Sequence, residues 1–402
     1  MTAPLQAKAR LRSVRRSPLA APRRAVATVF AAQGAAVAAV STTVPAVKER
    51  LSLSPLTMTV LVVTVALSAG VGSFAGLAVI RRLGQAAAMR AAVVATAVAL
   101  LLIGWAPSQA AVAVSYALFG MTLGCIDVSA NARAAAVERH YGRSIFASFY
   151  AAWSAAGVAA ALLTAGTARL GLSAEYTLTA QAGVVLVLAL TVRSHALPAD
   201  APSAVSGHGE SVALGRGLWV QLAPFGLVLL VAYVIDSTVS SWSTLYLHQT
   251  LDTALSLAPL AYAAYQVGTV TGRSCADRLV RTIGPVAVIR AATLLTAVAL
   301  AGLAVAPAWP YAVLAAACTG LGVSALVPLC LASAGRLRPG ATEAVLARMN
   351  VFNYAGVLAG GAASGILGST GHFRLAYGIP AALVLALLVT ARSFAWPPRP
   401  PL

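Results

Sequence analysis

One pattern runs through the whole sequence: about 20 mostly apolar residues, a short polar break, and then another apolar run. An apolar run of that length is long enough to cross the hydrocarbon core of a bilayer as a helix. Charged residues make up 9% of the chain, far below the roughly 25% that is typical of soluble domains. We therefore predict an all-α polytopic membrane protein that is surrounded by a lipid bilayer.

Twelve segments fit this pattern. They are residues 25–47, 56–80, 86–106, 110–134, 145–168, 174–192, 217–247, 256–276, 285–306, 309–334, 343–368 and 373–394. The break at 193–216 is the longest and contains prolines, glycines and charges of both signs, as a linker does. We predict two six-helix halves, 25–192 and 217–394, joined by this linker and flanked by the tails 1–24 and 395–402.

The basic residues predict the orientation. With the N-terminus inside, 24 of the 28 Lys and Arg residues fall on the side of the cytoplasmic tails and breaks, and four fall outside: Lys48, Arg50, Arg169 and Arg374. This asymmetry follows the positive-inside rule and places both tails and the linker in the cytoplasm of a bacterial cell. It also explains the net charge of +18 without a nucleic-acid partner, because no single basic patch forms.

The basic N-terminal tail has a second interpretation, as the start of a signal peptide with a twin-arginine pair at Arg15 and Arg16. The following apolar run of about 23 residues is longer than the 7–15 residues usual in such signals. We expect a tail that stays in the cytoplasm, followed by an uncleaved first helix.

The two halves share residues at an offset of 200. The matching pairs are Gly72 and Gly272, Arg81 and Arg281, Gly84 and Gly284, Pro107 and Pro307, Gly120 and Gly320, and Gly171 and Gly371. These are turn, packing and topology residues, which a duplicated six-helix unit preserves. Parallel repeats of six helices describe one large class of transporters.

Residues 25–394 resemble the major facilitator superfamily. The segment GRSCADRLVRTIG, residues 272–284, is similar to its Gly-rich, Asp-Arg loop, whereas the equivalent IRRLG, residues 80–84, lacks the acid. The stretch CIDVSANARAAAVERHYGR, followed by FYAAWSAAG, resembles the bacterial fucose-permease-like branch. The resemblance implies two pseudo-repeats that work by alternating access, and a cytoplasmic gate. The gate residues would be Arg81, Arg82, Glu138, Asp277, Arg278 and Arg281.

Two acids lie well inside predicted helices, Asp127 and Asp236. A carboxylate at that depth is costly and usually functional, so we assign both to proton coupling, with Asp236 also a candidate for binding substrate. Asn131 follows Asp127 by one helical turn and shares its face, which leaves open a purely structural pairing that locks helix packing.

Other polar residues are candidates for the substrate cavity, since the resemblance implies that helices 1, 4, 7 and 10 line it and helices 2, 5, 8 and 11 flank it. Tyr262, Gln266, Thr269 and Arg273 form a polar stripe on one helix. The candidates are Gln33, Asn131, Trp153, Tyr233, Tyr262, Gln266, Asn350 and Asn353. We interpret Trp242 and Tyr246 as residues of the interfacial aromatic belt.

These features predict a secondary active transporter of a small solute that works as a monomer and uses protons. Both directions of transport stay open, so an efflux antiporter for drugs or metabolites is the alternative to a symporter for sugars or similar solutes. A membrane-embedded enzyme or a sensor without transport is disfavoured. The sequence lacks the nucleotide-binding, hydrolase and metal-site motifs that an enzyme would carry, and we expect no metal and no cofactor.

Overall fold

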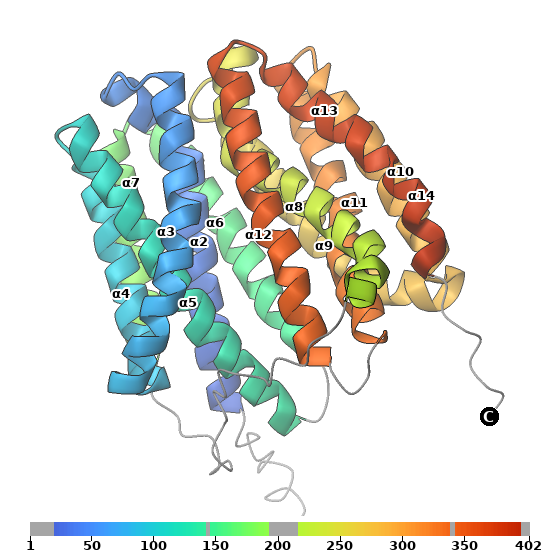
Figure 1. Ribbon diagram of the computed structural model, residues 1–402. Helices are drawn as coiled ribbons and strands as arrows, with labels where there is room; N and C mark the ends of the chain where they lie inside the picture. Colours follow the sequence, from blue (N-terminus) through green and yellow to red (C-terminus); the bar gives the residue numbers. More distant parts are fainter. Residues whose placement is uncertain (1–19, 142–144, 193–215, 338–341, 395–402) are drawn as a thin grey trace, which may run out of the picture.

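The computed structural model describes residues 20–141, 145–192, 216–337 and 342–394. Across these ranges the chain is a bundle of long helices without a strand (Figure 1). The helices are α2 (Ala20–Arg50), α3 (Pro55–Leu83), α4 (Gln85–Gly104), α5 (Gln109–Tyr141), α6 (Phe146–Arg169), α7 (Ala174–Thr191), α8 (Arg216–Thr250), α9 (Leu260–Ile283), α10 (Pro285–Ala304), α11 (Trp309–Gly335), α12 (Thr342–Ser369), α13 (Phe373–Leu385) and α14 (Leu387–Thr390), with the short 3₁₀ helix η2 (Ala391–Phe394) at the end. The predicted all-α membrane fold is confirmed.

The helices match the predicted spans closely, with α13, α14 and η2 forming one continuous crossing. Eleven segments of the described residues are long and apolar enough to cross a membrane. The helix that does not qualify is α9, which covers Leu260–Ile283 where residues 256–276 were predicted. It carries the polar stripe, so its low hydropathy reflects side chains that face the protein rather than lipid. The largest other shifts are at the start of α2, which begins at Ala20, and at the end of α5, which continues to Tyr141.

Glycines end equivalent helices in the two halves. Gly84 and Gly284 have φ angles of 77° and 80°, and Gly171 and Gly371 have 73° and 79°. A positive φ is unfavourable for residues with a Cβ atom, so glycine is the residue that allows the chain to turn sharply between helices at these points. Each pair is separated by 200 residues, which confirms that the offset found in the sequence marks two structural repeats.

The other glycine pairs bring helices into close contact. Gly72 on α3 faces the backbone of Met121 on α5, and Gly272 on α9 faces Leu321 on α11 in the same way. A Cβ atom at position 72 would lie 2.7 Å from the Met121 Cα, so no larger residue fits without moving a helix. Small residues are the usual means of close helix packing inside a membrane. The α3–α5 and α9–α11 contacts therefore repeat as well.

Replacement of Gly72 by alanine is expected to destabilise the protein by about 1–3 kcal/mol, the usual cost of overpacking. Thermal unfolding of the detergent-solubilised protein measures this as a lower melting temperature. Gly70 is the matched control because it lies on the same helix, and a Cβ atom added there would have no atom within 4 Å. Gly70→Ala should leave the melting temperature unchanged or raise it, since alanine favours helix by about 1 kcal/mol. Equal effects of the two substitutions would contradict the packing assigned to Gly72.

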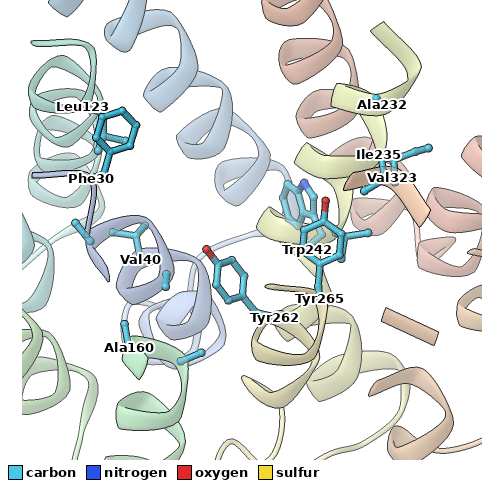
Figure 2. Packing of buried hydrophobic residues seen from close by; sticks show 14 of the residues in the cluster. Phe30, Val40, Leu123, Ala160, Ala232, Ile235, Trp242, Tyr262, Tyr265 and Val323 are labelled. Carbon is cyan, nitrogen blue, oxygen red and sulfur yellow. The ribbon is translucent and has the colours of Figure 1, made fainter. Parts of the chain in front are cut away.

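The aromatic residues near the end of α8 lie inside the protein. Trp242 is 1% exposed and donates from Nε1 to the Gly361 carbonyl at 3.0 Å, and Tyr246 is fully buried and donates to the Leu303 carbonyl at 2.9 Å. The interpretation of these two residues as an interfacial belt was wrong. Trp242 lies among the buried side chains of the core (Figure 2), and Trp242 and Tyr246 pack against the rings of Phe373 and Tyr377 on α13.

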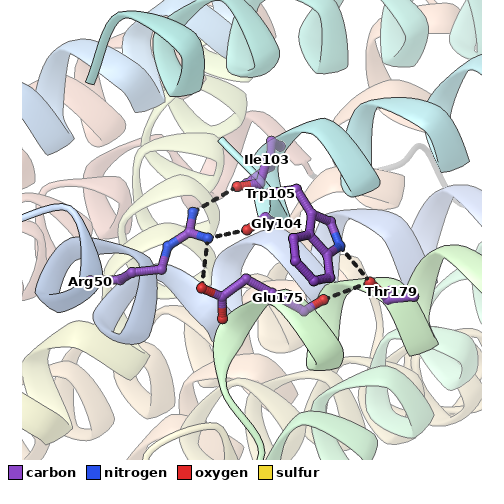
Figure 3. A network of polar contacts seen from close by, with 6 residues as sticks. All are labelled: Arg50, Ile103, Gly104, Trp105, Glu175 and Thr179. Carbon is purple, nitrogen blue, oxygen red and sulfur yellow. Dashed lines mark hydrogen bonds and ion pairs between the residues drawn. The ribbon is translucent and has the colours of Figure 1, made fainter. Parts of the chain in front are cut away.

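Two of the four cations predicted to be external have structural partners at helix ends. Arg50 donates to the carbonyls of Ile103 and Gly104, where α4 ends, and forms a 3.0 Å ion pair with Glu175 (Figure 3). Arg374 donates to the Ala304 carbonyl at 3.0 Å, where α10 ends. The last carbonyls of a helix lack intrahelical donors and carry partial negative charge, which an arginine satisfies. These contacts give both residues a structural reason to lie on the side that is otherwise poor in cations.

Helices α2–α7 pack among themselves, and so do α8–η2. The two groups meet where α6 contacts α9, α3 contacts α12, and α2 contacts α8. The predicted domain boundaries stay a prediction, because residues 193–215 of the linker lie outside the described ranges. The contacts between the groups are thus made by α2, α3 and α6 on one side and by α8, α9 and α12 on the other.

Candidate functional site

Asp127 is held by a helix of its own half. Its Oδ1 accepts a 2.6 Å hydrogen bond from Gln33 Nε2, which joins α5 to α2. The Gln33 side chain is buried, while Asp127 keeps part of its surface exposed. Asn131, one turn further along α5, is not the observed partner, and its buried Oδ1 has no hydrogen bond within the described part of the chain. The carboxylate therefore has a neutral amide as its hydrogen-bond partner in the structure.

Asp236 has a similar environment in the other half. Its Oδ1 accepts a 2.6 Å hydrogen bond from the hydroxyl of Tyr265, which joins α8 to α9. Tyr265 is fully buried, and Asp236 is partly exposed. Arg273, two turns further along α9, attracts Asp236 electrostatically but forms no direct ion pair with it among the described contacts. Asp236 thus has a cation in its surroundings.

The two acids face a common region. Tyr233 of α8 interacts electrostatically with Asp127, Asp236 and Arg273, as well as with Tyr150 of α6. Tyr150 in turn interacts with Asp127 and Arg273, which come from different halves of the chain. The two acids therefore have an electrostatic neighbour in common, Tyr233, although among the described contacts neither acid interacts with the other directly.

The polar stripe of α9 contributes further side chains to this region. Tyr262 and Gln266 are buried, and their side chains interact with each other one helical turn apart. Figure 2 shows Tyr262 pointing toward the helix that carries Val40, which is α2. A Cβ atom added at Gly157 of α6 would lie 3.5 Å from the same hydroxyl. Tyr262 therefore lies where the two groups of helices meet.

Arg273 completes the stripe. Its guanidinium group lies over the ring of Tyr150, with 5.7 Å between Cζ and the ring centroid. Its Nη1 is buried and has no hydrogen-bond partner in the part of the chain that the structure describes. The sequence stripe named this residue, but it was not among the candidates for the cavity. An arginine inside an otherwise membrane-spanning segment was the signal that could have selected it.

The remaining candidates are placed less centrally or are not described. Trp153 packs against the core and Asn353 is partly exposed, while the side chains of Asn350 and Asp277 lie outside the described residues. Sequence reasoning missed three tyrosines that contact or surround the acids: Tyr150, Tyr265 and Tyr354. Because tyrosine is uncharged and is common where membrane helices meet the interface, its presence alone gave no signal.

The candidate gate residues lie at the ends of the helices. Arg81, Arg82, Arg278 and Arg281 lie there with at least part of their surface accessible. Glu138 accepts a 2.7 Å hydrogen bond from the backbone N–H of Ile145, at the start of α6. That bond links the segments on either side of residues 142–144, which are not described. The gate itself stays a prediction, because the structure gives no side chain for Asp277.

At the opposite end of the bundle a contact joins the two halves directly. His248 at the end of α8 lies 2.5 Å from Glu49 at the end of α2, measured from Nε2 to Oε1. His248 Nδ1 lies 2.8 Å from the Thr253 carbonyl. Since both ring nitrogens face acceptors, the protonated imidazolium satisfies both contacts. On the same side, Gly365 of α12 packs closely against Thr59 of α3.

The sequence matches the family model described as "Major Facilitator Superfamily" over residues 25–307 and 225–402. Among curated proteins, an uncharacterized transporter of Sinorhizobium fredii, y4wD, is 29% identical and covers 92% of this chain and 98% of its own length. An uncharacterized MFS-type transporter of Yersinia pestis is 26% identical, over 71% of this chain and 73% of its own. The membrane protein MosC of Rhizobium meliloti is 27% identical, over 84% and 81%.

Solved structures share the fold at low identity. A mutant of the nucleoside transporter NupG superposes with a TM-score of 0.71 at 13% identity, covering 93% of this chain and 99% of its own. A bacterial homolog of the human lysosomal transporter Spinster, in an inward-facing and unoccupied conformation, gives a TM-score of 0.69 at 12% identity, covering 96% and 100%. The resemblance to the fucose-permease-like branch stays a prediction.

Proposed function

This chain belongs to the major facilitator superfamily, whose members move solutes across membranes, and on this premise we propose that it is a secondary active transporter of a small polar solute that is coupled to protons. The observation that carries the proposal is the placement of Asp127 and Asp236. They come from different halves, both interact electrostatically with Tyr233, and each accepts a hydrogen bond from a neutral donor.

Asp127 is the candidate for the coupling proton. A carboxyl group that alternates between apolar surroundings and water can bind a proton in one state and release it in the other. Its partner Gln33 suits both states, because an amide has NH₂ donors for the carboxylate and a carbonyl acceptor for the protonated acid. The bond between α2 and α5 can therefore persist while the proton comes and goes.

Alternating access is supported by the contacts between the halves. Glu49 and His248, together with Gly365 and Thr59, join the two halves at one end of the bundle. With the orientation predicted from the basic residues this end is external, and both chain termini are cytoplasmic. We take the arrangement as the inward-facing state of a transporter in the bacterial cytoplasmic membrane. In the alternate state these contacts would separate.

The test uses the purified full-length protein in liposomes with an imposed pH gradient. The vesicles are exposed to a boiled and filtered extract of bacterial metabolites, or loaded with it, and mass spectrometry identifies the solutes that move against their own gradient. We expect one or more solutes to accumulate or to be expelled only while the pH gradient is present. The two arrangements distinguish a symporter from an antiporter.

Empty liposomes and a protonophore are the controls. If the protein moves no solute in either arrangement, the proposed transport is wrong. If solute moves but neither the protonophore nor the pH gradient affects it, the protein is a transporter and the proposed proton coupling is wrong.

A further inference from the structure

The guanidinium group of Arg273 keeps one donor that its structural contacts do not use. Its Nη1 is shielded from solvent and makes no hydrogen bond among the described residues. A buried donor without a partner destabilises the protein, more so when it is charged, so native proteins seldom keep one without a use. Asp236, an acid that interacts electrostatically with Arg273, already has a hydrogen bond from Tyr265 and forms no direct ion pair with Arg273 among the described contacts.

The residues around the Arg273 guanidinium group limit which ligands could bind to it. Tyr150 of α6 supplies the face of its ring at 5.7 Å, so the group is held between the two halves of the protein. Tyr233 interacts electrostatically with Arg273 and with both acids. A ligand that reaches Arg273 is therefore also within reach of Asp236. Arg273 offers hydrogen-bond donors and Asp236 an acceptor, and the two side chains interact electrostatically.

We propose that Arg273 binds an acid group, a carboxylate or a phosphate, on the transported solute, an inference that rests on the proposed transport function. The planar guanidinium presents parallel N–H groups that match two oxygens of a carboxylate or phosphate. Asp236 then accepts hydrogen bonds from hydroxyl or ammonium groups elsewhere on the same molecule. The substrate class is a small solute that combines one acid group with several hydrogen-bond donors, such as a hydroxy acid, an amino acid or a sugar phosphate.

The metabolite experiment described above tests this directly, with Arg273→Gln added. The solutes that the wild-type protein moves should carry a carboxylate or a phosphate, and their identity decides between the two. Arg273→Gln should weaken their transport at least tenfold, since a charge-assisted bond is lost. Arg273→Lys should recover part of the transport activity, because lysine restores the positive charge but lacks the parallel N–H donors of the guanidinium group. Arg290→Gln, at an exposed arginine of the next helix, should have no effect.

The outcomes separate this inference from the proposed function. If the protein moves only solutes without an acid group, the role of Arg273 is wrong and the transporter assignment stands. If it moves nothing, the transporter assignment fails and this inference fails with it. If Arg273→Gln transports the acidic solutes as well as the wild type does, Arg273 does not bind them.

A purely structural role for Arg273 predicts a different result for a double variant. Suppose that the arginine only balances the charge of Asp236. Each single substitution, Arg273→Gln or Asp236→Asn, should then reduce transport, and the double variant, which lacks both charges, should restore it. If Arg273 binds the substrate, the double variant should stay at least as impaired as Arg273→Gln. The methyl ester of a transported carboxylic acid gives a second readout, because Arg273→Gln should bind it as well as the wild type does.

Discussion

The Asp127→Asn variant is expected to lose all accumulation against a gradient while it still exchanges solute across the membrane. An asparagine cannot bind or release a proton, so the pH gradient can no longer drive the cycle. Its amide resembles the protonated acid in shape and neutrality. The Gln33 side chain can still bond to it, because either amide can donate or accept. The fold and the exchange of one solute molecule for another should therefore survive.

Counterflow and uphill uptake in proteoliposomes measure the two properties separately. Counterflow should stay close to that of the wild type, while the concentration of solute inside the vesicles only equals that outside. Asp252→Asn is the matched control, since Asp252 is exposed on the turn after α8 and should retain both activities. If Asp127→Asn still concentrates solute with unchanged pH dependence, Asp127 is a packing residue.

The Asp236→Asn variant is expected to bind the transported solute about ten- to a hundredfold more weakly. Loss of a hydrogen bond to a charged group costs about 1.5–3 kcal/mol, and each 1.4 kcal/mol is a factor of ten in affinity. The reduction follows from the lost charge and not from the lost contact with Tyr265, because asparagine keeps an acceptor oxygen for the tyrosine hydroxyl. Equilibrium binding to the purified protein gives the dissociation constant.

Tyr265→Phe separates the two roles of Asp236. This variant keeps the carboxylate and removes the hydroxyl that positions it, so we expect a smaller loss of affinity than for Asp236→Asn. A dissociation constant of Asp236→Asn equal to that of the wild type would contradict a role in binding. It would leave Asp236 as a second proton-binding residue if uphill transport nevertheless fell.

Much of the fold follows from local features of the sequence. Runs of about 20 apolar residues predict helices, because unpaired backbone N–H and C=O groups are too costly in lipid. A single segment can pair all of them only as a helix. The glycines at an offset of 200 predicted the repeated turns and close packing, since only glycine suits a positive φ or a backbone contact. A carboxylate inside an apolar membrane segment is energetically costly, so the sequence alone identified Asp127 and Asp236 as candidate functional residues.

The partners of those residues were decided by tertiary structure alone. Helical spacing suggested Asn131 beside Asp127, but the contact between α2 and α5 gives Asp127 a hydrogen bond from Gln33. Periodicity defines which residues share a face, whereas the neighbour of that face depends on how helices far apart in the chain are rotated and packed. The packing of distant helices also determines that Trp242 is buried. It likewise brings Arg273 into contact with Tyr150 from the other half of the protein.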